Sequence, residues 1–243
     1  MSKIFTIAVS AIAVFLVFSQ TSFAGTDKTE VEKIIEEYIL NNPEIILQSV
    51  NDYQTNGVSE RQQRALEGNK RQLFENSFTP YAGNKDGDIV VVEFFDYNCG
   101  YCKRAYENVN KLINADKNVK FIFKEFPILG PTSETAARWA LAAHNQDKYV
   151  EFHNALMQSK GRISDKLLED VATSLNLDLD KMKKDSQSDT ITEYIASNRA
   201  LASELRITGT PGFIIQDEVI PGAISYEEMV TVIADKRAAT AKN

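Results

Sequence analysis

The chain has 243 residues, of which 43% are hydrophobic and 25% are charged, with 11 glycines and 6 prolines. This composition is typical of a globular protein and excludes disordered, collagen-like and low-complexity classes. The 27 basic and 34 acidic residues give a net charge of -7, so no basic surplus is available for a phosphate backbone and we expect no nucleic-acid partner.

Residues 1–24 have the pattern of a secretory signal peptide. Lys3 supplies the positive start, an apolar run extends from Ile4 to Phe18, and Ser22-Phe23-Ala24 is a small-x-small cleavage site. The run is shorter than the ~20 residues of a membrane-spanning helix, and an uncleaved anchor is the alternative. We therefore expect cleavage after Ala24 and export of the mature chain. The style of the signal indicates a bacterial periplasm, a compartment in which disulfides persist.

Residues 25–79 are predicted to form an N-terminal helical arm and linker. Apolar residues recur at helical spacing from Thr29, and a second helix is predicted after Asn42, which precedes Pro43. The stretch from Gln54 to Asn76 is polar, so we expect an exposed helix or helical linker there. The two apolar stripes comprise Val31, Ile34, Ile35, Tyr38 and Ile39, then Ile45, Ile46, Leu47, Val50 and Tyr53.

Two short amphipathic helices need an apolar partner, because isolated helices of this length are marginal in water. The arm could pack on the chain's own following domain or on copies of itself. The polar linker separates the arm from that domain, which favours a homo-oligomer formed through residues 25–79. No heptad register decides between a dimer and a trimer.

A buried strand is predicted from Ile89 to Phe95, where the run is apolar and rich in β-branched residues. After the turn Asp96-Tyr97-Asn98, Cys99 and Cys102 form a CxxC motif at the start of a predicted helix. Unpaired N–H groups and the helix dipole stabilise an anion there, so we expect a Cys99 thiolate with a pKa below ~8.5. Cys102, one turn further on and more buried, would attack the mixed disulfide formed on Cys99.

The residues between the cysteines, Gly100 and Tyr101, are expected to tune the redox potential through solvation of the thiolate. An inert disulfide is weakly supported, because closing so small a loop removes little chain entropy. A closed zinc site needs four ligands, and the two histidines, His144 and His153, lie far along the chain in a helical pattern. We therefore predict no resident metal or cofactor, although two thiolates alone could hold Cu(I).

Glu93 interrupts the apolar strand upstream of Cys99. A carboxylate in a buried strand is costly unless it is paired or functional. Glu93 could face an edge or pair with Lys124, or it could accept the proton of Cys102. The sequence leaves these interpretations open.

A third motif is TGTPGFII, in which Thr210-Pro211 precedes a predicted strand from Phe213 to Ile215. Alone it is weak, because an X-Pro turn is common and only about 5–6% of X-Pro bonds are cis. Together with VVVEFFDYNCGYC, the strand from Val119 to Phe126 and the tail IPGAISYEEMVTVI, it resembles the thioredoxin superfamily, specifically the bacterial DsbA-like exported thiol-disulfide oxidoreductases. The resemblance extends from Asn84 to Ala234.

The resemblance implies an α/β thioredoxin fold for residues 80–243, with a helical domain inserted at about 132–207, following the α-helical arm. It implies that Pro211 is a cis-proline facing the CxxC motif, leaving a backbone edge open for an extended substrate, with Thr210 beside the sulfurs. Within the insertion, Trp139 and the two histidines would be structural.

The active-site residues discriminate only partly between directions of disulfide chemistry. Gly-Tyr between the cysteines and Thr before the proline resemble disulfide isomerases of the DsbC kind, whereas DsbA-type oxidases usually carry Pro-His and Val. The isomerases of the DsbC kind dimerise through a β-rich N-terminal domain. The helical arm, with YILNNPEII, is more similar to exported DsbA-like proteins with an N-terminal helical extension, including the ScsC-like group, which form dimers or trimers.

These resemblances imply a periplasmic, homo-oligomeric disulfide isomerase or reductase. Its partners would be exported proteins with thiols or wrong disulfides, and a membrane thiol-disulfide partner of the DsbD or DsbB kind. The alternatives are a dithiol oxidase of exported proteins, a Cu(I)-binding protein using the same thiols, and a non-catalytic protein that kept the fold.

Overall fold

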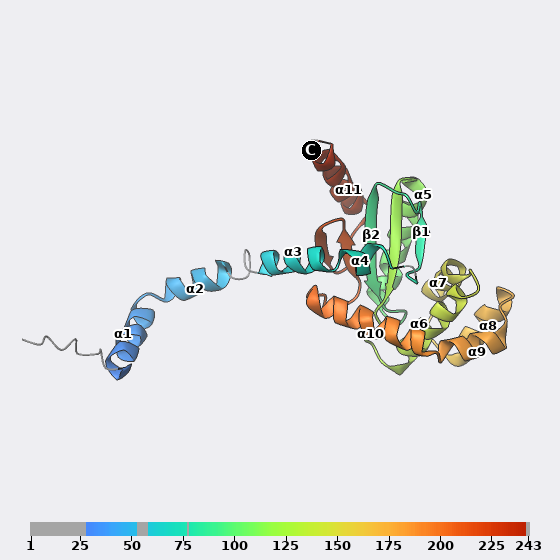
Figure 1. The fold of residues 1–243 in the computed structure, drawn as a ribbon, viewed down its shortest axis with the longest axis horizontal. Coiled ribbons are helices and arrows are strands. Elements are labelled where there is room, and N and C mark those ends of the chain that lie inside the picture. Colours follow the sequence, from blue (N-terminus) through green and yellow to red (C-terminus); the bar gives the residue numbers. More distant parts are fainter. Residues whose placement is uncertain (1–27, 53–57, 77, 242–243) are drawn as a thin grey trace, which may run out of the picture. The chain divides into compact units, whose positions relative to one another are not determined.

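The computed structural model describes residues 28–52, 58–76 and 78–241 (Figure 1). They belong to two compact units, Met1–Asp52 and Tyr53–Asn243, each of which is described by itself. The predicted signal peptide lies outside the described residues. Within the described part of the chain, no helix combines the length and the apolar character that crossing a membrane requires.

The first unit contains the two helices predicted for the arm, α1 (Lys28–Asn41) and α2 (Pro43–Asp52). Asn42 separates them: its side-chain amide donates to the carbonyl of Tyr38 at 2.7 Å, and its own carbonyl accepts from the N–H of Ile45 at 3.1 Å. No residue of either helix is buried. The exposed large apolar side chains are Val31, Ile34, Ile35, Tyr38, Ile39, Leu40, Ile45, Ile46, Leu47 and Val50.

The second unit is built on a five-stranded sheet in the order β1-β3-β2-β4-β5. Its strands are β1 (Tyr81–Gly83), β2 (Ile89–Phe95), β3 (Val119–Glu125), β4 (Gly212–Ile215) and β5 (Glu218–Pro221). β2 and β3 are parallel, and the other pairs are antiparallel. The buried strand predicted from Ile89 to Phe95 is therefore confirmed, as the central strand of the sheet.

Alternation along β2 sends side chains to two separate layers. Ile89, Val91 and Phe95 belong to the apolar layer that contains residues of α5 (Gly100–Ala115) and α11 (Tyr226–Thr240). Val92 and Phe94 belong to the opposite layer. Because both faces are covered, β2 carries apolar residues at nearly every position.

The opposite layer is completed by a segment that we expected to be an exposed linker. Helices α3 (Val58–Gly68) and α4 (Lys70–Phe74) are part of the second unit, and Leu66 and Leu73 are buried to 3% and 0% exposure. Both belong to the buried apolar cluster that also contains Leu205, which follows α10. The expectation of an exposed segment is therefore wrong for these helices, because two well-placed leucines dock an otherwise polar segment.

Five helices connect β3 to β4, where the helical insertion was predicted: α6 (Pro131–His144), α7 (Tyr149–Gln158), α8 (Asp165–Ser174), α9 (Leu179–Ser186) and α10 (Asp189–Glu204). In Figure 1 they run from yellow-green to orange beside the sheet. Trp139 and His153 are buried and His144 is half-buried. The α/β fold with an inserted helical domain is thus confirmed.

Candidate active site

The CxxC motif lies where β2 gives way to α5. Cys99 is the N-cap of α5, and its sulfur accepts a hydrogen bond from the N–H of Cys102 at 3.4 Å. Both cysteines are free thiols and both are buried, with 6% of Cys99 and none of Cys102 exposed. The predicted placement at a helix N-terminus, with the second cysteine deeper, is confirmed.

The two thiols differ strongly in acidity. A hydrogen bond from the Cys102 thiol, opposed by burial and supported by the Thr210 side chain and the N–H groups of Cys102 and Tyr101, lowers the pKa of Cys99 to about 5. Burial raises the pKa of Cys102 far above its ordinary value, and the hydrogen bond to Cys99 and the charge of Glu93 raise it further. At neutral pH the pair is therefore one thiolate and one thiol.

The peptide bond Thr210-Pro211 is cis, as the resemblance implies. The Cys99 thiol donates to the Thr210 carbonyl at 3.2 Å. An ionised Cys99 has no proton to donate, so ionisation frees that carbonyl to accept a different donor. Between the cysteines, Gly100 lies in the first turn of α5 and Tyr101 is 61% exposed, with the Arg104 guanidinium 4.2 Å from its ring centre.

Glu93 is 2% exposed, and its Oε1 has no hydrogen-bond partner among the described residues. Burial, and secondly the charge of Cys99, raise the pKa of Glu93 to about 8. Lys124 is not its partner: the Lys124 ammonium donates to the Gln72 carbonyl at 2.8 Å and to the Thr79 hydroxyl at 3.1 Å. Of the interpretations left open by the sequence, the ion pair is therefore wrong.

Asp96, treated in the sequence only as a turn residue, organises the site. Its carboxylate accepts four hydrogen bonds: from the N–H of Asn98 and the Ser133 hydroxyl, both at 2.7 Å, and from the N–H groups of Ile128 and Leu129 at 2.8 and 2.9 Å. These bonds join the turn before Cys99 to the start of α6. Asp-X-Asn is an ordinary turn pattern, so no sequence signal distinguished this carboxylate.

A second buried carboxylate, Glu125, was also missed. Its Oε1 accepts from the hydroxyls of Tyr97 at 3.0 Å and Tyr149 at 2.7 Å, and Tyr97 also contacts His153 Nδ1 at 3.2 Å. Burial raises the pKa of Glu125 to about 8 and lowers that of His153 to about 3, so His153 is neutral. Across residues 28–52, 58–76 and 78–241, no group of three or more His, Cys, Asp or Glu side chains could hold a metal ion.

Comparisons with known proteins agree with this geometry. The DSBA-like thioredoxin domain model matches residues 90–234, and the model of the copper resistance protein ScsC N-terminal domain matches residues 27–56. A thioredoxin-like oxidoreductase from Silicibacter pomeroyi is 40% identical, with a TM-score of 0.68; the alignment covers 70% of this chain and 98% of that one. A linker-deletion mutant of ScsC from Proteus mirabilis is 27% identical, with a TM-score of 0.72, covering 90% and 100%.

Sequence relatives are more distant. Disulfide bond formation protein D of Bacillus subtilis is 26% identical over 166 residues, which are 63% of this chain and 75% of that protein. The chain spans 24% of the length of two other curated relatives, Na(+)/H(+) antiporters of Salinispora. The chain belongs to the DsbA-like thioredoxin family of thiol-disulfide oxidoreductases.

Proposed function

We propose that this protein is a periplasmic thiol-disulfide oxidoreductase that acts as an isomerase or reductase on exported proteins. The observation that carries the oxidoreductase part of the proposal is the paired acidity of the motif: a Cys99 thiol with a pKa of about 5 beside a buried Cys102 thiol of raised pKa. The isomerase or reductase direction rests on the resemblance of Gly100, Tyr101 and Thr210 to the DsbC-type motifs. A thiolate at neutral pH is the attacking form in disulfide exchange, and a low pKa also makes Cys99 a good leaving group.

In this proposal the Cys99 thiolate attacks one sulfur of a substrate disulfide. The substrate S–S bond breaks, a Cys99–substrate disulfide forms, and the other substrate sulfur leaves as a thiolate. In isomerisation a different substrate thiolate attacks the substrate sulfur of the mixed disulfide, so a new substrate disulfide forms and the Cys99 thiolate is released, with no net transfer of electrons. In reduction Cys102 loses its proton and attacks the Cys99 sulfur, so the Cys99–Cys102 disulfide forms and the second substrate thiolate is released.

Glu93 is proposed as the acceptor of the Cys102 proton. Its carboxyl is buried, has an unsatisfied oxygen and has a pKa of about 8, so it can exchange a proton near neutral pH. Thr210 and Pro211 are proposed to present the backbone that holds an extended substrate, because the Thr210 carbonyl lies beside Cys99. Gly100 and Tyr101 are proposed to tune the thiolate, since the Tyr101 N–H contributes to its low pKa.

Self-association through the arm is the second part of the proposal. The apolar side chains of α1 and α2 are exposed, and an exposed apolar stripe on short helices calls for a partner surface. The match to the ScsC N-terminal domain covers the same residues, 27–56. An oligomer would bring several Cys99 sites to one substrate and raise the effective concentration of the second contact.

The discriminating experiment is reactivation of scrambled ribonuclease by the full-length mature chain. Ile35→Asp/Ile46→Asp, placed on the exposed apolar stripe, is compared with Glu36→Asp/Gln48→Asp in the same helices, and molecular mass is measured by light scattering. We expect the first variant to become monomeric and lose reactivation, while the second keeps both properties. Reactivation that is unchanged in a monomeric variant would remove the basis for the arm's role.

The same assay tests the alternatives. Cys99→Ser must abolish all exchange if Cys99 is the nucleophile. If the wild-type chain fails to reactivate ribonuclease but its disulfide form oxidises a reduced peptide rapidly, the protein is a dithiol oxidase. Stoichiometric Cu(I) retained by the reduced protein against a competing chelator would favour copper binding. The ScsC-like segment adds no soft ligand to that case, since residues 27–56 contain no Cys, His or Met.

A further inference from the structure

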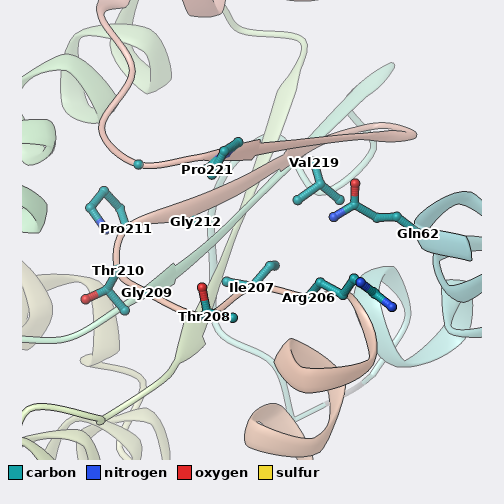
Figure 2. A pocket seen from close by; sticks show the side chains of 11 residues that line it. Gln62, Arg206, Ile207, Thr208, Gly209, Thr210, Pro211, Gly212, Val219 and Pro221 are labelled. Atoms are coloured by element: carbon teal, nitrogen blue, oxygen red, sulfur yellow. The ribbon is translucent and has the colours of Figure 1, made fainter. Parts of the chain in front are cut away.

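A cavity of about 340 Å³ opens beside the loop that carries Thr210. Figure 2 shows Thr210 and Pro211 at one end and Gln62 and Arg206 at the other. Three parts of the chain build it: the loop between α10 and β4, the β4–β5 hairpin, and α3 through Gln62. No residue of the CxxC motif lines it, so it is a separate feature beside the redox centre.

Thr210 lies between the cavity and the reactive sulfur. The Thr210 carbonyl is 3.2 Å from the Cys99 sulfur, and Thr210 also lines the cavity. A substrate cysteine that reacts with Cys99 therefore comes close to this residue. At about 3.3 Å per extended residue, neighbours one or two positions from that cysteine reach across the loop.

The walls favour an apolar side chain. Ile207, Val219 and Pro221 contribute aliphatic surface, and the volume is at the lower end of the ~300–1,000 Å³ of ligand pockets. Gly209 leaves space open, because a Cβ added there would meet nothing within 4 Å. The cavity thus has room for one large aliphatic side chain.

The rim is positively charged. Arg206 is exposed, and among the described residues no ion pair to its guanidinium is found. Gln62 is fixed by a hydrogen bond from its amide to the Leu205 carbonyl at 2.7 Å, so this side of the opening is held in place. An acidic residue beside the inserted side chain would meet an unpaired positive charge.

We propose that this cavity is a substrate subsite that takes an aliphatic side chain within two residues of the substrate cysteine, with an acidic residue next to it facing Arg206. The inference rests on the proposed function, because it names the polypeptide that the same redox centre attacks. It also makes α3, from the segment before the thioredoxin sheet, a wall of the substrate site.

The test uses the reduced full-length protein and short peptides joined to an identical copy by one disulfide. The enzyme dithiol gives up two electrons and becomes the Cys99–Cys102 disulfide, and the peptide disulfide becomes two thiols, so either sulfur attacked yields the same product. The peptides carry Leu or Gly, and Asp or Lys, at each of the two positions on either side of the cysteine. Released thiol is followed by chromatography.

We expect Leu to be favoured over Gly by about tenfold at one position, the effect of burying a large aliphatic side chain. Gly209→Leu fills the cavity and should bring that ratio to near one, whereas Gly68→Leu, at a second glycine with open space, should leave it unchanged. Asp should be favoured over Lys by about threefold at low salt, and Arg206→Asn, but not Lys160→Asn, should remove that preference.

The outcomes separate this inference from the proposed function. If the wild-type protein reduces all peptides equally, or if Gly209→Leu and Arg206→Asn keep the wild-type ratios, the subsite is refuted and the oxidoreductase stands. If no peptide disulfide is reduced although Cys99 is alkylated as a thiolate near pH 6, the proposed function itself fails. Thermal unfolding of each variant confirms that altered ratios belong to folded protein.

Discussion

Helices α1–α2 and helices α3–α4 follow one another in the chain and differ in what their side chains contact. The first pair exposes its large apolar residues, from Val31 to Val50. The second pair is mostly polar, yet it buries Leu66 and Leu73 in the layer beneath the sheet. Apolar content alone therefore does not decide burial: a segment is buried when a complementary surface exists in the same unit.

The docked segment is also tied down by hydrogen bonds. The Asn69 amide donates to Glu204 at 2.8 Å, the Gln72 amide to the Ser197 carbonyl at 3.2 Å, and buried Lys124 to the Gln72 carbonyl at 2.8 Å. These contacts fasten α3 and α4 to the rest of the second unit. A truncation that starts at Pro80 would remove core residues together with the arm, so point substitutions in α1 and α2 are the cleaner probe of the arm.

The largest expected effect is the difference between truncating a buried leucine of α4 and truncating an exposed leucine of α2. Leu73→Ala, at a fully buried side chain, should lower the free energy of unfolding by about 3 kcal/mol. Leu47→Ala, at a side chain that is 71% exposed, should leave the free energy of unfolding within about 0.5 kcal/mol of the wild-type value. The chain's single tryptophan, Trp139, is buried in the second unit and reports its unfolding by fluorescence in urea. Equal losses for the two variants would erase the contrast between the segments.

Next in size is a pH effect at the Lys124 anchor. Burial lowers the pKa of Lys124 to about 7, below the ~10.4 of the unfolded chain, so the unfolded chain binds more protons from pH 7 to 10. Stability therefore rises with pH across this window, by about 1 kcal/mol between pH 7 and 8. Lys124→Met should lose that rise when urea unfolding is repeated at each pH.

The contribution of Lys124 is the free energy of unfolding of the wild-type protein minus that of Lys124→Met at each pH. Burial raises the pKa of Glu93 and Glu125 to about 8, so their contribution to stability falls as pH rises from ~4.3 to 8. Both carboxyls remain in Lys124→Met, and subtraction removes their slope. A difference curve that is flat between pH 7 and 8 would show that Lys124 stays protonated in the folded protein.

The sequence predicts the redox centre better than its surroundings for a physical reason. Cys99, Cys102 and the Thr210-Pro211 turn are local motifs, so the apolar runs beside them in the sequence place them at a helix N-terminus and before a strand. Asp96 and Glu125 act through partners that are distant in the chain, Ser133 and Tyr149 among them. Likewise, Leu66 and Leu73 share a buried cluster with residues of β2 and of the region around Leu205, and helical periodicity does not contain that tertiary relation.

A smaller effect is expected at Gln62. Gln62→Ala removes the hydrogen bond to the Leu205 carbonyl, which should cost about 0.5–1.5 kcal/mol. Gln48→Ala, at an exposed position of α2, should change the free energy of unfolding by less than about 0.5 kcal/mol. The same urea titration measures both. If Gln62→Ala also falls below that limit, the leucines alone hold α3 in place.

The smallest effect is expected at exposed ion pairs, one of which is present in each of the two segments. Lys28 pairs with Glu32 in α1 at 3.7 Å, and Lys70 pairs with Glu67 beside α4 at 2.7 Å; in both pairs more than half of each side chain is exposed. Exposed pairs contribute little, so Lys28→Gln and Lys70→Gln should each shift stability by less than about 0.5 kcal/mol. Helicity and unfolding by circular dichroism at low and high salt give the comparison. A larger loss for Lys70→Gln would mean that charge, besides the buried leucines, distinguishes the docked segment from the arm.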